Sequence, residues 1–201
     1  KKKKELSDSI TLWFCRDLIP FHEIEKEGLK DFLKFHNVIQ SLSDVPCSST
    51  LSRRSLTRIY EDCLFAVKLK INGDNPNMVS LTMDAWTDNY RHKPFMTFTL
   101  HWISPIITQL KSCVLQTSFL PHPHTANNIV EELKKALTRF NLNEKIIILV
   151  TDRGANMIKA ATYMKVERIS CIAHGLHNLV MVDTLSKLLE VNKIIVKART
   201  I

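Results

Sequence analysis

The spacing of apolar residues changes once along this 201-residue chain, at the turn-rich segment INGDNPN, residues 71–77. Before this segment, apolar residues recur every three or four positions, as on one face of a helix. After it, apolar and polar residues alternate, as in strands with one buried face. We therefore predict a helical module over residues 1–72 and an α/β domain over residues 75–201.

The α/β part has an ordered series of expected elements. The expected strands and helices, in chain order, are strands near 78–84, 94–103 and 109–119, a helix capped by Thr125, the strand KIIILVTD, a helix from about Gly154, a strand near 167–171 and a helix near 173–190. The first three strands can form a meander, and the later strands follow crossover helices and so pair in parallel. Because KIIILVTD is continuously apolar, we expect it to be covered on both faces. This order is that of a ribonuclease-H-like fold, here an incomplete mixed sheet preceded by a small helical module.

The composition of the chain limits the partners and cofactors that we expect. The net charge of +8 favours a polyanion such as DNA. No apolar run reaches the roughly 18 residues of a membrane span, so no membrane association is expected. The five cysteines are far apart, which argues against a disulfide framework and a zinc finger. The four glycines do not form a phosphate-binding loop, so no nucleotide cofactor is expected.

Two acids follow predicted neighbouring strands. Asp84 ends the first strand within SLTMDAWTDNY, and Asp152 ends KIIILVTD. Two carboxylates brought together favour a bound cation, and Mg²⁺ prefers such oxygen ligands. The alternatives are ordinary ones: Asp84 and Asp88 as residues that end a strand, and Asp152 as a helix N-cap.

Several basic side chains are candidates for contact with nucleic acid. The third expected helix of the module runs from about Ser52 to Leu69. Arg53, Arg54 and Arg58 surround its apolar stripe, and they form either a solvated face or a phosphate-contacting face. His124 lies in a loop before a helix, where it either supports the helix start or contacts DNA. Arg153, next to Asp152, is a further candidate.

Four blocks resemble the transposases of the hAT superfamily: LTMDAWTDNYRHKPFMTFTLHWI, LPHPHTANNIVEELKKAL, IIILVTDRGANMIKA and CIAHGLHNLV. The resemblance implies a core that cuts and joins DNA with Mg²⁺ or Mn²⁺, with Asp84 and Asp152 as the first two acids of a metal-binding triad. It also implies that Cys171 and His174 form the family's C-x-x-H motif. Trp86 is expected to pack beneath the loop of the site. The expected location is the nucleus, and the helical module is expected to bind DNA or to form homo-oligomers.

The sequence departs from the family's pattern in two ways. The third acid of the family is a glutamate far downstream, and the family's DNA-binding zinc finger precedes the helical module. The 201 residues contain neither feature, so we expect a fragment, a decayed copy or a domesticated copy. Enzymatic activity is therefore left open. The alternatives are a non-catalytic DNA-binding or protein-interaction module, and a nuclease in which Glu132 or Glu190 replaces the third acid. A structural zinc is not expected, because one helix supplies only Cys171 and His174.

Overall fold

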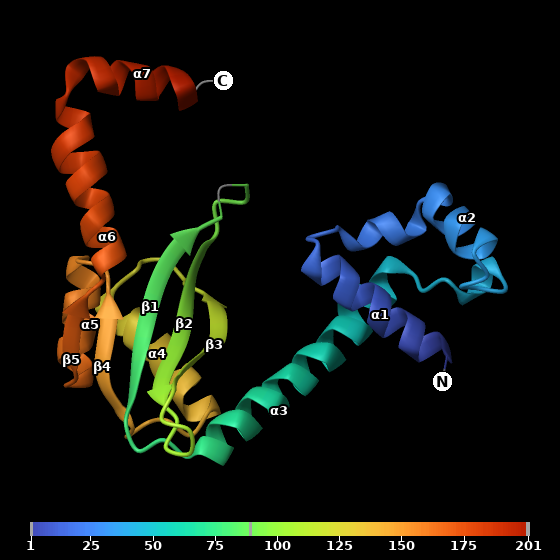
Figure 1. Ribbon diagram of the computed structural model, residues 1–201, viewed down its shortest axis with the longest axis horizontal. Helices are drawn as coiled ribbons and strands as arrows, with labels where there is room; N and C mark the ends of the chain where they lie inside the picture. The colour runs from blue at the N-terminus through green and yellow to red at the C-terminus, as the bar shows by residue number, and fades with distance from the viewer. Residues whose placement is uncertain (1, 89, 200–201) are drawn as a thin grey trace. The chain divides into compact units, whose positions relative to one another are not determined.

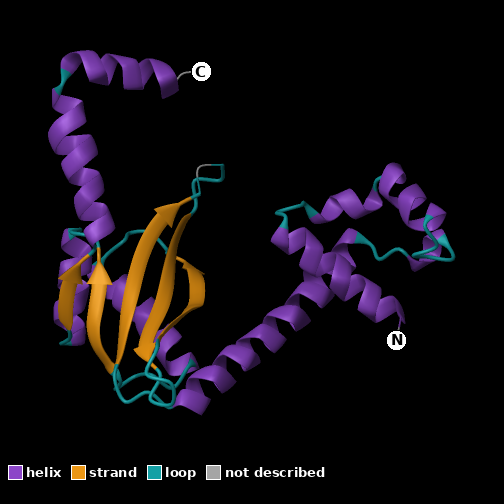
Figure 2. Ribbon diagram, viewed as in Figure 1, coloured by secondary structure: helices purple, strands orange, loops and turns teal. Residues whose placement is uncertain are grey.

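The computed structural model describes residues 2–88 and 90–199, which form two compact units, residues 1–70 and residues 71–201 (Figures 1 and 2). Each unit is described by itself. The elements of the first unit are α1 (Lys2–Arg16), η1 (Phe21–Glu25), α2 (Glu27–Phe35), η2 (Leu42–Asp44), η3 (Thr50–Ser55) and α3 (Leu56–Asp74), which continues into the second unit.

The second unit contains the sheet. Its elements are β1 (Val79–Thr87), β2 (Pro94–Ile103), β3 (Leu110–Phe119), α4 (Ala126–Arg139), β4 (Ile146–Thr151), α5 (Ala155–Met164), β5 (Glu167–Ser170), α6 (Ile172–His177), η4 (Asn178–Thr184), η5 (Leu185–Lys187) and α7 (Leu189–Arg199). None of the helices in the described residues is both long and apolar enough to cross a membrane.

The helical unit has its own small core. Apolar residues from its helices and the loop after α2 pack together: Ile10, Phe14, Ile24, Leu33, Ile39 and Leu51. The expected apolar stripe of the third helix is not part of this core. Tyr60 is 47% exposed, and Ile59 and Leu64 are only half-buried. The buried residues are instead Leu51 and Ser55 in η3, just before α3, and Ile71 and Asp74 at the end of α3.

The helix α3 ends later than the sequence predicts. Residues 71–74 belong to the expected turn, yet the helix continues through them to Asp74. The buried Asp74 carboxylate accepts hydrogen bonds from Trp102 Nε1 at 2.7 Å, Ser104 Oγ at 3.0 Å and Lys111 Nζ at 2.8 Å. These three donors come from β2, the following turn and β3, so Asp74 fastens the end of the helix to the hairpin.

The predicted mixed sheet is confirmed. Its strand order is β3-β2-β1-β4-β5, as the neighbouring arrows in Figure 2 show. The β1–β2 and β2–β3 pairs are antiparallel and form the expected meander, and the β1–β4 and β4–β5 pairs are parallel. The crossovers α4 and α5 contact each other. Strand β1 therefore lies at the centre, where the meander meets the parallel strands.

One face of the sheet carries the core and the other is open. Along β1, Val79, Leu81 and Met83 are buried, and they alternate with residues that are only partly buried. Helix α4 covers the core with Ile129 and Leu133, and its start is capped as predicted, because Thr125 Oγ1 accepts from Asn128 N–H. The prediction that KIIILVTD is covered on both faces is wrong: Ile147 is 43% exposed. A continuous apolar run does not by itself determine whether the second face has a partner.

A candidate metal site at the ends of strands β1 and β4

The structure places Asp84 within β1 and Asp152 directly after β4, the neighbouring strand. The prediction that Asp84 ends its strand is wrong, because β1 continues to pair with β2 through Thr87. Thr82 pairs with Val150, and each acid follows two residues later in the chain. Neighbouring strands are about 4.8 Å apart, and residues two apart point to the same face. On its other side, Asp84 lies opposite Thr97 of β2. The register thus brings the backbone of Asp84 and that of Asp152 close together on neighbouring segments of the sheet.

A set of hydrogen bonds holds the loop that follows Asp152. Asp152 Oδ1 accepts from Gly154 N–H at 2.9 Å. Arg168 of β5 donates to the Asp152 carbonyl oxygen at 3.0 Å, so the guanidinium fixes the backbone rather than the carboxylate. A Cβ atom at Gly154 would lie 3.0 Å from Asp152 Oδ1 and 2.7 Å from Asn156 Oδ1, so the absence of a side chain is what allows this close approach.

His174 and Cys171 approach the same acids from α6. Cys171 directly precedes α6, and its N–H donates to the Thr151 carbonyl oxygen at 2.7 Å, which ties the start of the helix to β4. His174 Nε2 lies 3.8 Å from Asp84 Oδ1. A hydrogen bond with Cys171 raises the pKa of His174, and the charges of Asp84 and Asp152 raise it further. A hydrogen bond from the backbone of His174 lowers the pKa of Cys171. When protonated, the imidazole is therefore a countercharge for Asp84 and Asp152.

Trp86 and Asp88 lie beyond Asp84 on the same segment. The Trp86 ring stacks on Phe95 of β2 with 4.9 Å between centroids, and its Nε1 donates to Thr97 Oγ1 at 3.2 Å. These contacts place Trp86 on the open face of the sheet, whereas the sequence predicted that it packs beneath a loop. Asp88 accepts from the N–H groups of Tyr90 and Arg91, at 3.0 and 3.2 Å, and is a turn residue as expected.

The loop before α4 reaches the same end of the sheet. Asn156 Nδ2 donates to the His124 carbonyl oxygen at 3.0 Å, which joins this loop to the start of α5. The His124 ring stacks on His122, and burial lowers the pKa of His124. Arg153 is exposed and lines a cavity of about 400 Å³ together with Cys171 and residues of α6. The links through Asn156 and Arg168 were not foreseen, because such contacts depend on which loops the fold brings together.

The donor set fits a hard divalent cation. Asp84 and Asp152 offer carboxylate oxygens, the ligands that Mg²⁺ and Mn²⁺ prefer. Within the described residues, no lysine or arginine forms an ion pair with either acid, and no group of three histidine, cysteine or acidic residues is arranged to hold a metal. Glu132 instead accepts from Lys135 at 2.9 Å, and Glu190 accepts from Lys193 at 2.9 Å.

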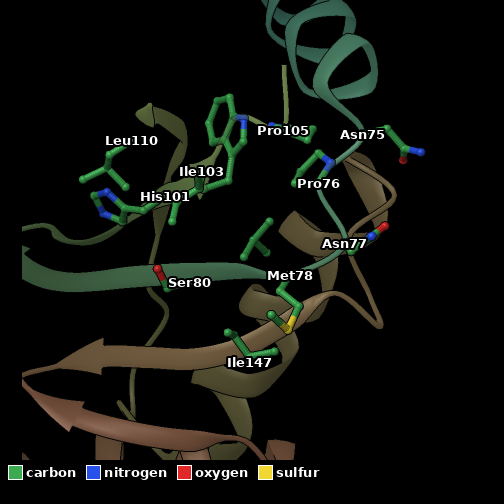
Figure 3. Close-up of a pocket in the computed structure, with 12 residues that line it drawn as sticks. Asn75, Pro76, Asn77, Met78, Ser80, His101, Ile103, Pro105, Leu110 and Ile147 are labelled. Atoms are coloured by element: carbon green, nitrogen blue, oxygen red, sulfur yellow. The ribbon is translucent and has the colours of Figure 1, made fainter. Parts of the chain in front are cut away.

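A second cavity lies at the other end of the strands. Its volume is about 490 Å³, and Figure 3 shows Met78 and Ile147 at one side of it and Leu110 at the other. The residues described around it include no acid, lysine or arginine, and His101 is their titratable side chain. His101 Nε2 is 2.9 Å from Thr82 Oγ1. The cavity therefore offers mainly apolar surface, and His101 is the side chain in its lining that can transfer a proton.

Comparison with known proteins gives two sequence matches. Residues 82–171 match the family described as the ZBED1 RNase-like domain. The chain is also 30% identical over 208 residues to the transposable element Hobo transposase of Drosophila melanogaster, covering 96% of this chain and 31% of that protein. The chain thus spans about a third of the length of this relative. Together with the sheet order, the RNase-like match confirms the predicted ribonuclease-H-like fold.

Solved structures give weaker likenesses. The HTLV-2 integrase catalytic core domain in complex with magnesium (trimeric form) is 13% identical, with a TM-score of 0.28, and the match covers 57% of this chain and 72% of that one. The simian T-cell lymphotropic virus intasome in complex with the PP2A regulatory subunit B56 gamma is 14% identical, with a TM-score of 0.27, over 59% of this chain and 43% of that one.

Proposed function

This chain is related to the transposases of the hAT superfamily, and on that premise we propose that Asp84 and Asp152 hold a divalent metal ion that acts on DNA. The observation that carries the proposal is the parallel register, in which Thr82 pairs with Val150, the residues two positions before Asp84 and Asp152. Two adjacent carboxylates repel each other unless a positive charge lies between them. His174 supplies part of that charge, and a metal ion supplies more.

The role that we propose for each residue of the site follows from its contacts and position. A bound Mg²⁺ or Mn²⁺ would polarise a phosphodiester oxygen. Asp152 is held in place by the N–H group of Gly154, and Asp84 by its position in β1 between two neighbouring strands. Arg153 is exposed beside Asp152, where it can contact a phosphate. The protein's part is to position the ion and the DNA.

We further propose that the two acids bind metal but do not support efficient strand cleavage by themselves. In a two-ion site, a third carboxylate helps to hold the second ion, which stabilises the leaving oxygen. Within the described residues, neither Glu132 nor Glu190 joins Asp84 and Asp152 in a metal-binding group. Loss of several kcal/mol of stabilisation would reduce the rate by about 10³-fold or more. A chain that nicks plasmid DNA with Mn²⁺, and loses this in Asp152→Ala, would contradict this proposal.

Titration with Mn²⁺, followed by calorimetry and by electron paramagnetic resonance, tests the metal site. We expect the wild-type chain to bind Mn²⁺, and Asp84→Asn and Asp152→Asn each to weaken binding at least about tenfold, because each removes one ligand. Asp88→Asn is the matched control, since Asp88 lies four residues from Asp84 and serves a turn. Equal affinities of the wild type and both site variants would rule out the site.

The second candidate function is a non-catalytic DNA-binding module. The net charge of +8 favours it. It is also favoured because, among the described residues, no third acid joins Asp84 and Asp152 in a group that could hold a metal. This candidate predicts duplex binding that persists in EDTA, weakens steeply with salt and is unchanged in Asp84→Ala. A nuclear location and homo-oligomers formed through the helical unit belong to both proposals. Fluorescence microscopy of the tagged chain and sedimentation of the purified chain test these two points.

A further inference from the structure

A cavity in the helical unit is lined by four basic residues. Its volume is about 470 Å³, and it lies between α1, the loop before η3 and the start of α3. Lys3 and Lys4 come from α1, and Arg54 and Arg58 come from the η3–α3 helix. All ten lining residues belong to one compact unit; none of them is an aspartate or a glutamate, and Cys47 contributes a thiol.

The four cations are not equivalent. Arg58 forms an ion pair with Asp8, and Lys3 donates to the Ser43 carbonyl oxygen at 2.6 Å and lies 4.0 Å from Asp44. These two side chains are occupied in holding the unit together. By contrast, the side chains of Lys4 and Arg54 make no hydrogen bond or ion pair with the described part of the chain, and both are exposed. Two uncompensated positive charges therefore border the same cavity from two different helices.

We propose that this cavity binds a phosphate group of a DNA backbone, with Arg54 and Lys4 as its ligands. The inference rests on the proposed function in one respect, that DNA is the partner. Arg54 can donate two parallel hydrogen bonds to phosphate oxygens, and Lys4 supplies a compact charge from α1. Thr50 also lines the cavity, but its hydroxyl group is 3.1 Å from Cys47 Sγ and is not assigned to the phosphate. The proposed ligands are therefore the two cationic side chains.

The cavity distinguishes two arginines that are neighbours in the sequence. Arg53 and Arg54 are both exposed, yet only Arg54 lines the cavity. A purely solvated basic face, or a diffuse attraction of DNA by net charge, gives both residues the same importance. A phosphate site in the cavity makes Arg54 more important for DNA binding than Arg53. Arg53→Gln and Arg54→Gln change the net charge equally. A difference in DNA affinity between the two variants therefore reports the contribution of the cavity and not that of the overall charge.

The test is fluorescence anisotropy of a labelled DNA duplex, titrated with the full chain in EDTA over a range of salt concentrations. We expect Arg54→Gln and Lys4→Gln each to weaken binding and to reduce the slope of log affinity against log salt by about 1, the value for one lost phosphate contact. Arg53→Gln should leave the slope near that of the wild type. Arg54→Lys should retain part of the affinity. Circular dichroism and thermal melting verify that each variant is folded.

Each alternative outcome has a distinct meaning. Equal losses in Arg53→Gln and Arg54→Gln would overturn the cavity assignment and leave DNA binding intact. Absence of duplex binding by the wild-type chain would overturn both the cavity assignment and DNA as the partner. Binding of inorganic phosphate or pyrophosphate without binding of DNA would replace the DNA backbone by a free phosphate. Because EDTA removes divalent metal, none of these outcomes depends on Asp84 and Asp152.

Discussion

His174 Nε2 lies 3.8 Å from Asp84 Oδ1, and the two residues come from segments 90 positions apart. The pKa of His174 is raised by its hydrogen bond with Cys171 and by the charges of Asp84 and Asp152. A raised pKa in the folded state means that the attraction stabilises the fold below the ordinary value of 6.5 and is lost as the pH rises through the folded pKa.

We therefore predict a pH-dependent coupling between these two residues. A double-mutant cycle with Asp84→Asn and His174→Gln, measured by chemical denaturation, should give a favourable coupling at pH 5.5 that vanishes at pH 9. The coupling should stay below about 1 kcal/mol, because the His174 side chain is 45% exposed and solvent screens the pair. A coupling of the same size at both pH values would contradict this prediction.

Gly154 gives a second prediction. In Gly154→Ala the new Cβ atom would lie 2.7 Å from Asn156 Oδ1 and 3.0 Å from Asp152 Oδ1, so the loop that holds Asp152 must shift. We expect Mn²⁺ affinity to fall by about 10- to 100-fold, the range for loss of a group that orients a metal ligand. The measurement is Mn²⁺ titration calorimetry.

Gly175→Ala is the control for this substitution. Gly175 lies in α6, and a Cβ atom there meets nothing within 4 Å. We expect its metal affinity to match the wild type and its stability to rise by about 0.4–1 kcal/mol, because alanine reduces the freedom of the unfolded chain. Equal metal affinities for the two alanine variants would show that Gly154 does not position Asp152.

The strand order was accessible from the sequence, because hydrophobic periodicity and right-handed crossovers leave few topologies, and it puts Asp84 and the segment before Asp152 on neighbouring strands. The groups that support Asp152 were not accessible. Arg168 and Asn156 act through the Asp152 and His124 carbonyl oxygens, and sequence patterns do not show which carbonyl group a side chain will meet. Local patterns indicate elements, whereas these contacts depend on how loops from different elements come together.

Asp74 is the clearest case in which tertiary contacts override local composition. Within INGDNPN it looks like a turn residue, but it is only 6% exposed and accepts hydrogen bonds from Trp102, Ser104 and Lys111. The hydrogen bonds from Lys111 and Trp102 lower the pKa of this carboxyl group. The turn composition correctly indicated a boundary, but the buried carboxylate extends the helix to that boundary.

Asp74 also leads to a third prediction. Because its pKa is lowered in the folded state, its ionised form stabilises the fold above pH 3.8, and this stabilisation is lost as the pH falls toward the folded pKa. Asp74→Asn should lower the melting temperature at pH 7, and should flatten the fall in melting temperature between pH 4 and pH 2. Adding Lys111→Met to Asp74→Asn should restore part of the stability, because it removes the unpaired ammonium group. Melting curves that fall with acid as steeply in the variant as in the wild type would contradict this role.

Cys47 is expected to be an unusually acidic thiol. Hydrogen bonds from the hydroxyl groups of Ser49 and Thr50, each 3.1 Å from Sγ, lower its pKa from 9.0 to about 7. About half of the thiol should therefore be thiolate at pH 7, and the thiolate is the reactive form. In a chain whose other four cysteines are replaced by serine, the rate of alkylation by iodoacetamide should rise with a midpoint near pH 7.

Removing the two hydroxyl groups tests the cause of this acidity. Thr50→Val together with Ser49→Ala should move the midpoint of the alkylation rate toward 9.0, because the thiolate loses its two side-chain donors. Thr50→Ser retains a hydroxyl group and should leave the midpoint near 7. Circular dichroism verifies that η3 and α3 are intact, since Ser49 and Thr50 lie at the start of η3. If the double variant kept a midpoint near pH 7, the two hydroxyl groups would not be the cause, and the backbone N–H group of Thr50 would be the main remaining donor.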